Sequence, residues 1–145
     1  MDDRPDDTMG RQAIVATVKL LAKYPGVEYE QGEGELAIKG SVDGFDIVVR
    51  DEGQVATIGC SYWHDDFTDP EEVAKFVVWL LSPRMRLKVT YRGKHSVKGV
   101  VESKCQDGSW TPESVFGLLI PIIGKKRTAY LGNSVVDPNE VPFDS

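Results

Sequence analysis

The stretch MRLKVTYR, residues 85–92, alternates apolar and polar side chains without a break. The apolar positions are Met85, Leu87, Val89 and Tyr91, and the polar positions are Arg86, Lys88, Thr90 and Arg92. A period of two places successive side chains on opposite faces of a β-strand. The stretch therefore predicts a half-buried strand with one face on a core and a basic face turned to water.

The segments that follow this strand continue the same pattern. Gly93 and Lys94 make a turn, and HSVKGVVESKC at 95–105 predicts a partner strand. The segment 110–123 predicts one or two further strands, and KKRTAYLG at 125–132 predicts a last strand or a short helix. Three or four strands are therefore expected in this half of the chain.

The segment before the strand carries the signals of a helix. Asp69 is the expected N-cap, Pro70 the first helical residue, and Glu72 the third, which is a capping-box arrangement. Apolar residues then recur at helical spacing at positions 73, 76, 77 and 80, and Ser82-Pro83 ends the run. Residues 69–82 are therefore expected to form one amphipathic helix.

The first half of the chain predicts another helix followed by four short strands. Asp7 or Thr8 can cap a helix over 9–24, which Pro25-Gly26 terminates. Between residues 27 and 62, four alternating segments are separated by glycine-bearing turns. Each of these segments presents one apolar face and one largely acidic face.

Together these elements predict an α+β fold, an antiparallel sheet of about six to eight short strands with two helices packed on one face, in the order α-β-β-β-β-α-β-β-β(-β). One domain is expected over 9–132, with a disordered tail at 1–8 and a loose tail at 133–145. In arrangement alone, this order of elements is similar to that of bacterial secretion chaperones and of some small regulatory proteins.

Charge is distributed unevenly along the chain, whose formal net charge is -6. Residues 1–83 hold 7 basic and 17 acidic side chains, whereas residues 84–127 hold 10 basic and 3 acidic ones. The net charge argues against a general nucleic-acid binder, but the basic half can form a positive surface. With two cysteines and no apolar leader at 1–10, a reducing cytoplasm is the expected location.

The segment GCSYWHDDFTDPEE, residues 59–72, holds the strongest candidate for catalysis. His64 could act as a general base oriented by Asp65 or Asp66, with Cys60 as a nucleophile. On an extended strand, Cys60 and His64 would lie roughly 13 Å apart, which requires a bend. The alternative is that Cys60 is a core residue and that the acids after it complement the start of a helix.

Metal and cofactor signals are weak. Cys60, His64, His95 and Cys105 could supply two thiolates and two imidazoles to zinc, but their spacing is not that of a short-loop zinc site. The acids at 65–69 lack the glycine and terminal glutamate of a calcium loop. Neither a metal nor a cofactor is predicted.

Two features suggest a binding surface. Arg86, Lys88 and Arg92 share the polar face of the strand at 85–92, and Lys98 and Lys104 can join them from the neighbouring strand. Further cations that could extend this surface are Arg84, Lys94 and the KKR at 125–127. These cations could contact an acidic partner or phosphates, or could simply keep a sheet face solvated. Trp110 and Tyr130 are the aromatic residues that could remain exposed among them.

The second feature is the apolar run VFGLLIPIIG at 115–124, which includes Leu119, Ile120 and Ile122. It is too short to span a bilayer. Pro121 places it at a sheet edge or bulge, where it could be part of the core or could meet another chain.

The sequence favours a small non-enzymatic cytoplasmic module that binds a protein partner through the apolar run or the basic strand face. The partner is unknown, and a second copy of the chain is one candidate. Two alternatives stay open. One is a small hydrolytic or metal-dependent enzyme centred on His64, Asp65 and Asp66, and the other is a nucleic-acid-binding domain that uses the strand pair at 84–104.

Overall fold

The computed structural model describes residues 8–60, 63–117 and 124–137. Within these ranges it contains two helices and nine strands, and it confirms the α+β class with antiparallel pairing. The elements in chain order are α1 Met9–Leu21, β1 Tyr29–Gly32, β2 Glu35–Ile38, β3 Ile47–Asp51, β4 Ala56–Cys60, β5 Trp63–Phe67, α2 Pro70–Leu80, β6 Met85–Arg92, β7 His95–Lys104, β8 Trp110–Gly117 and β9 Lys126–Gly132.

The strands form two sheets where the sequence predicts a single one. The first sheet has the order β1-β2-β3-β4-β5, and the second has the order β8-β7-β6-β9. The strand that the sequence pattern did not predict is β5, whose residues WHDDF include three polar side chains in a row. Its alternation is nevertheless regular, because Trp63 is buried, Asp65 and Phe67 are half-buried, and the residues between them are exposed.

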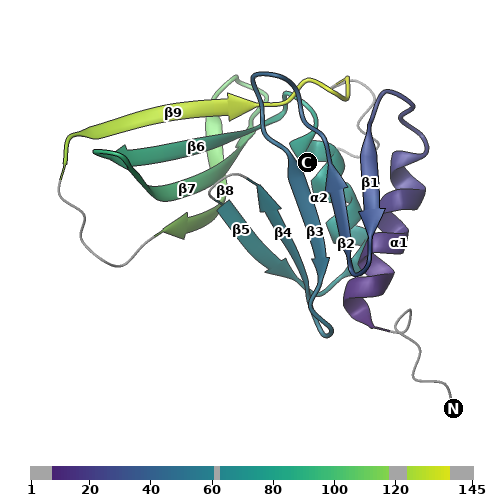
Figure 1. Cartoon of the computed structure of the whole chain (residues 1–145). Helices are drawn as coiled ribbons and strands as arrows, with labels where there is room; N and C mark the ends of the chain where they lie inside the picture. Colours follow the sequence, from purple (N-terminus) through teal and green to yellow (C-terminus); the bar gives the residue numbers. More distant parts are fainter. Residues whose placement is uncertain (1–7, 61–62, 118–123, 138–145) are drawn as a thin grey trace, which may run out of the picture.

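Both helices cover the same face of the five-stranded sheet (Figure 1), as expected for two helices packed on one face. Each helix begins at a side-chain cap: Thr8 Oγ1 accepts from the backbone N–H of Arg11, and Asp69 Oδ1 accepts from that of Glu71. The apolar stripes of the helices meet the inward residues of the strands, and Ile14, Ile47 and Val77 are fully buried. Fully burying a side chain of this kind contributes about 1.5–3 kcal/mol, so this layer is the core of the protein.

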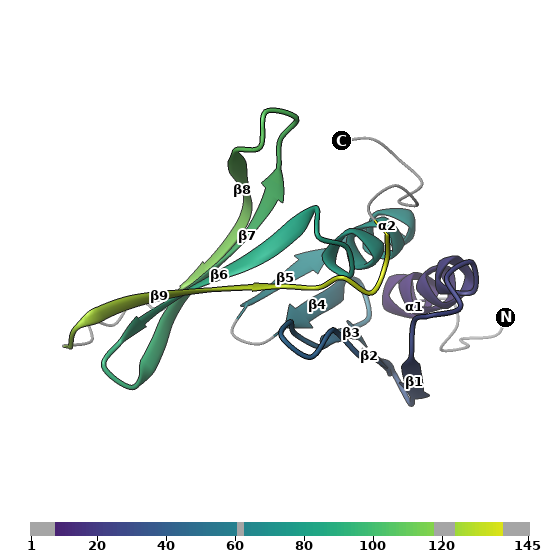
Figure 2. The ribbon, with the colours of Figure 1, turned by 90° about the horizontal axis from the view of Figure 1, so that it is seen from above.

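The four-stranded sheet extends away from the helices, as Figure 2 shows from above. The alternation is confirmed over 85–89, where Met85, Leu87 and Val89 are buried, but it fails at the next two positions. Thr90, expected to face water, is buried and Tyr91 is half-buried, at the point where the register with β7 shifts. The two sheets meet where β7 and β8 pass β5. Gly99 of β7 allows this approach, because a Cβ at that position would lie 3.2 Å from the Cβ of Trp63.

The ordered structure continues past residue 132, where the sequence analysis places the end of the domain. Asn133 is 1% exposed and Val136 is 2% exposed. Asn133 Oδ1 accepts from the backbone N–H groups of Ser41 and Phe45, while its Nδ2 donates to the carbonyls of Phe45 and Leu80. A segment that reads as a polar tail therefore begins with a buried amide that links the 41–45 loop to the end of α2.

Several regions named in the sequence analysis fall outside the described residues. They are 1–7 and 138–145 of the two expected tails, and 118–123 of the apolar run. Neither described helix has the length and apolarity needed to span a bilayer.

Candidate functional site

The predicted catalytic residues lie on β5, and the strand separates them. His64 and Asp66 are exposed on the face of the first sheet that is turned away from the helices, which we call the open face. Asp65 points to the opposite face, because neighbouring side chains on a strand alternate. Asp65 therefore does not orient His64, whereas Asp66 shares its face.

Asp65 takes part in a hydrogen-bond chain that joins the two sheets. The Nε1–H of buried Trp63 donates to Ser114 Oγ at 3.0 Å, and the Ser114 hydroxyl donates to Asp65 Oδ2 at 2.6 Å. Two residues farther along β8, the ring of Phe116 lies 4.2 Å from that of His64, centroid to centroid. Strand β8 thus crosses the edge of β5 and reaches both of its faces, which gives Asp65 a structural partner.

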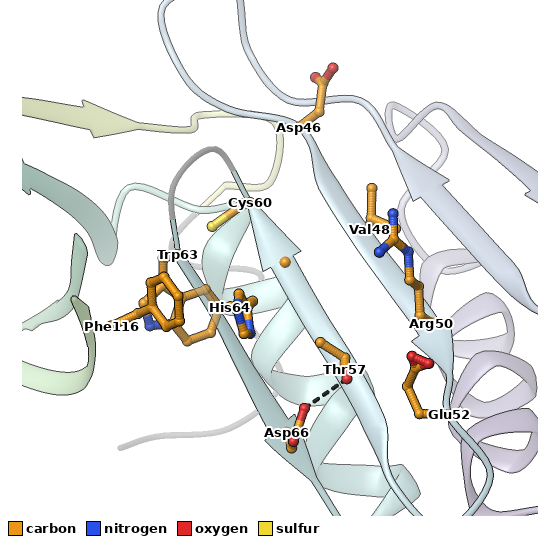
Figure 3. Close-up of a pocket in the computed structure, with 11 residues that line it drawn as sticks. Asp46, Val48, Arg50, Glu52, Thr57, Cys60, Trp63, His64, Asp66 and Phe116 are labelled. Atoms are coloured by element: carbon orange, nitrogen blue, oxygen red, sulfur yellow. Dashed lines mark hydrogen bonds between the residues drawn. The ribbon is translucent and has the colours of Figure 1, made fainter. Parts of the chain in front are cut away.

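The open face is hollowed where β8 approaches it. The hollow has a volume of about 700 Å³, and Figure 3 shows side chains of β3, β4 and β5 around it together with Phe116. Its lining residues are Asp46, Val48, Arg50, Glu52, Thr57, Gly59, Cys60, Trp63, His64, Asp66 and Phe116. The hydroxyl of Thr57 donates to Asp66 Oδ1 at 2.7 Å, which fixes that carboxylate at one end of the hollow.

Cys60 does not have the properties of a nucleophile. It is 5% exposed, and burial raises the pKa of its thiol to about 12. The thiol therefore stays protonated at neutral pH, whereas the reactive form of cysteine is the thiolate.

The four residues considered for zinc are not brought together. His95 begins β7 and Cys105 follows its end, so at about 3.3 Å per residue the two lie roughly 30 Å apart. Among the described residues, no group of three or more histidine, cysteine, aspartate or glutamate side chains could hold a metal ion.

In contrast, the structure does bring together the four cations named as a binding surface. Directly paired residues of antiparallel strands share a face. Lys88 pairs with Val100 and Tyr130, Thr90 with Lys98 and Thr128, and Arg92 with Lys126. We call this side of the four-stranded sheet the basic face, and its cations are Arg86, Lys88, Arg92, Lys98, Lys104 and Lys126.

Arg86, near the start of β6, lies on this face between two aromatic rings. Its guanidinium carbon is 4.1 Å from the Trp110 ring centroid and 4.2 Å from that of Tyr130. Its Nε donates to Glu102 Oε1 at 2.7 Å. The other acid on these four strands, Glu113, instead accepts from Ser103 on the far side of the sheet. Glu102 is thus the acid that shares the basic face, and it is already paired.

Lys104 and Lys126, which were expected to extend this surface, also lie on the basic face. Lys98 pairs with Thr90, and Arg92 shares the face of Thr90 by alternation along β6; Lys126 joins them because it is the β9 partner of Arg92. Leu119, Ile120 and Ile122, the apolar part of the predicted surface, lie outside the described residues.

Comparisons with family models, with curated proteins and with solved structures gave no significant match to this chain.

Proposed function

We propose that the protein is a non-enzymatic binding module whose basic face binds an acidic segment of a protein partner. The observation that supports this most is that six cations from three strands share one face, on which Arg86 also lies between two aromatic rings. Arg92, Lys98, Lys104 and Lys126 are exposed, and Lys88 is half-buried. Glu102 pairs with Arg86, so most of the positive charge faces solvent.

The same face also offers apolar contacts, which favour a peptide over a purely ionic ligand. Tyr130 is 52% exposed and Val115 is 59% exposed. Val115, Val100, Lys88 and Tyr130 form one row across the sheet, so the two exposed apolar side chains lie in line with Lys88. Acidic segments that carry a few apolar residues match this combination of charges and apolar surface.

A nucleic acid matches the surface less well. The flat faces of Trp110 and Tyr130 that a base could stack on are partly covered by the guanidinium of Arg86. The rest of the molecule is strongly acidic, because residues 1–83 hold 17 acidic and 7 basic side chains. A long polyanion would be repelled by these charges, whereas a short acidic segment can bind the basic face alone.

The test compares two charge-reversed variants by fluorescence anisotropy. The probe is a labelled peptide rich in glutamate, aspartate and leucine. In one variant, Lys88→Glu and Lys98→Glu alter the basic face, and in the matched control, Lys19→Glu and Lys23→Glu make the same change of net charge at exposed positions in and just after α1. We expect the first variant to bind at least about tenfold more weakly, which corresponds to about 1.4 kcal/mol, and the control to bind within about twofold of wild type.

Two outcomes would contradict the proposal. Equal loss in both variants would show that net charge matters and that the basic face does not. Tighter binding of a single-stranded oligonucleotide than of the peptide, lost in Lys88→Glu/Lys98→Glu, would assign the surface to nucleic acids. Light scattering on the free protein tests the remaining candidate: a dimer that dissociates in the same variant would identify a second copy of the chain as the partner.

A further inference from the structure

The hollow on the open face is a second site, separate from the basic face. Gly59 lies on its floor, with Val48 of β3 and His64 of β5 as its direct cross-strand neighbours. A Cβ at Gly59 would meet no atom nearer than 3.7 Å, so there is free space above this glycine. The missing side chain therefore opens the sheet surface at this point.

One part of the hollow is apolar and aromatic. Adjacent strands lie about 4.8 Å apart, which places Val48 and His64 roughly 10 Å from each other across Gly59. The half-buried Phe116 packs against His64 and limits the hollow on the β8 side. This space accepts one planar ring lying on the backbone of Gly59.

The other part is acidic. Asp66 follows His64 on the same face of β5, roughly 6.6 Å farther along the strand. Its Oδ1 accepts from Thr57, and Glu52 lies on the same side of the hollow. Arg50 is a cation that also lines the hollow, but its Nε donates to Glu35 Oε2 at 2.9 Å, which offsets its charge and leaves Asp66 and Glu52 uncompensated. The charge of the hollow at this end is therefore negative.

We propose that the hollow binds a small organic cation with an aromatic or compact apolar body, of the class of protonated arylalkylamines. The ring lies over Gly59 between Val48 and the His64–Phe116 pair, and the ammonium group lies at Asp66. The spacing of roughly 6.6 Å along β5 matches the short chain that joins a ring to an amine. A carboxylate in place of the ammonium would be repelled by Asp66 and Glu52.

The probe for the test is tryptamine. The control compound is indole-3-acetate, which has the same ring and the opposite charge. Binding is followed by NMR shifts of the Gly59 amide and the His64 ring. For a ligand of this size we expect a Kd in the millimolar range. Asp66→Asn keeps an acceptor for Thr57 but removes the charge, and should weaken tryptamine binding about tenfold.

The matched pair of variants adds the same side chain inside and outside the hollow. Gly59→Val fills the space above the floor and should abolish the shifts. Ala37→Val adds valine to an exposed position on the open face that does not line the hollow, and should bind within about twofold of wild type.

Three results would overturn the proposal: no shift with tryptamine at concentrations well above the millimolar range, equal binding of indole-3-acetate, or undiminished binding by Gly59→Val. If Gly59→Val does not fold by circular dichroism, the Asp66→Asn comparison decides, and unchanged affinity there also rejects the site. Because both variants leave the basic face intact, the outcome is independent of peptide binding.

Discussion

Replacing Asn133 by alanine should destabilise the protein more than any surface substitution. The side chain is 1% exposed and makes four hydrogen bonds to main-chain groups of Ser41, Phe45 and Leu80. The variant leaves these groups without their partner in a space that the amide filled. Each buried polar group that loses its partner costs about 1–3 kcal/mol. Ser41 is half-buried and its N–H can bind water, so the remaining buried groups of Phe45 and Leu80 set an expected total of about 3–5 kcal/mol.

The measurement is urea unfolding followed by circular dichroism. With an m-value of about 2 kcal/mol/M, this loss shifts the midpoint by about 2 M. Asn133→Asp should also be destabilised, because it keeps the acceptor for Ser41 and Phe45 but loses both donated bonds. The neighbouring Ser134→Ala is the control. Ser134 is exposed, and its backbone N–H still donates to Ser41 Oγ in the variant. Removing the Ser134 hydroxyl should therefore cost less than about 0.5 kcal/mol.

A loss of about 1 kcal/mol or less in Asn133→Ala would refute this reasoning. It would mean that water or a shifted backbone replaces the four bonds, and that the segment after β9 is not part of the cooperative core. Equal losses in Asn133→Ala and Ser134→Ala would lead to the same conclusion.

Three further outcomes are expected. A thiol reagent at pH 8 should label Cys105 and spare Cys60 until urea is added, and labelling of both thiols at equal rates would contradict the burial of Cys60. From about pH 9 upward only the unfolded chain loses the Cys60 proton, so the free energy of unfolding should fall as pH rises from about 9 to about 12. Gly99→Val should lower the free energy of unfolding in urea by about 1–3 kcal/mol, because the valine side chain collides with Trp63 and moves the sheets apart. Wild-type stability of this variant would argue against the contact. Ser114→Ala should cost about 1–2 kcal/mol and change the intrinsic fluorescence, because the buried indole N–H of Trp63 loses its acceptor; an unchanged spectrum and midpoint would count against the hydrogen bond.

The candidate sites were only partly predictable. Alternation alone placed Arg86, Lys88 and Arg92 on one strand face, and the register confirms that they share it. The stacking of Arg86 on Trp110 and Tyr130 depends on strands β8 and β9, which are separated from β6 along the chain. The catalytic hypothesis at residues 64–66 was drawn from adjacency in sequence, but adjacency on a strand puts Asp65 on the other face.

The sequence by itself determined what depends on nearby residues. The cap at Asp69, the two helices, seven of the nine described strands and the basic polar face of β6 follow from spacing and end signals within a few positions. Two alternatives stayed open, Asp7 or Thr8 as the first cap and a strand or a short helix at β9. These patterns act over one turn of helix or one pair of strand neighbours, so they can be read locally.

Only the tertiary structure decided how these pieces divide and meet. It split the strands into two sheets and paired WHDDF with β4, where Asp65 meets a donor from Ser114. It also placed Asn133 in the core and opened the hollow above Gly59. In each case a polar group or a glycine is stable where it lies because of a partner or neighbour far away in the chain. The burial of a polar side chain depends on whether its hydrogen bonds are met, and the sequence pattern around it carries no record of such distant partners.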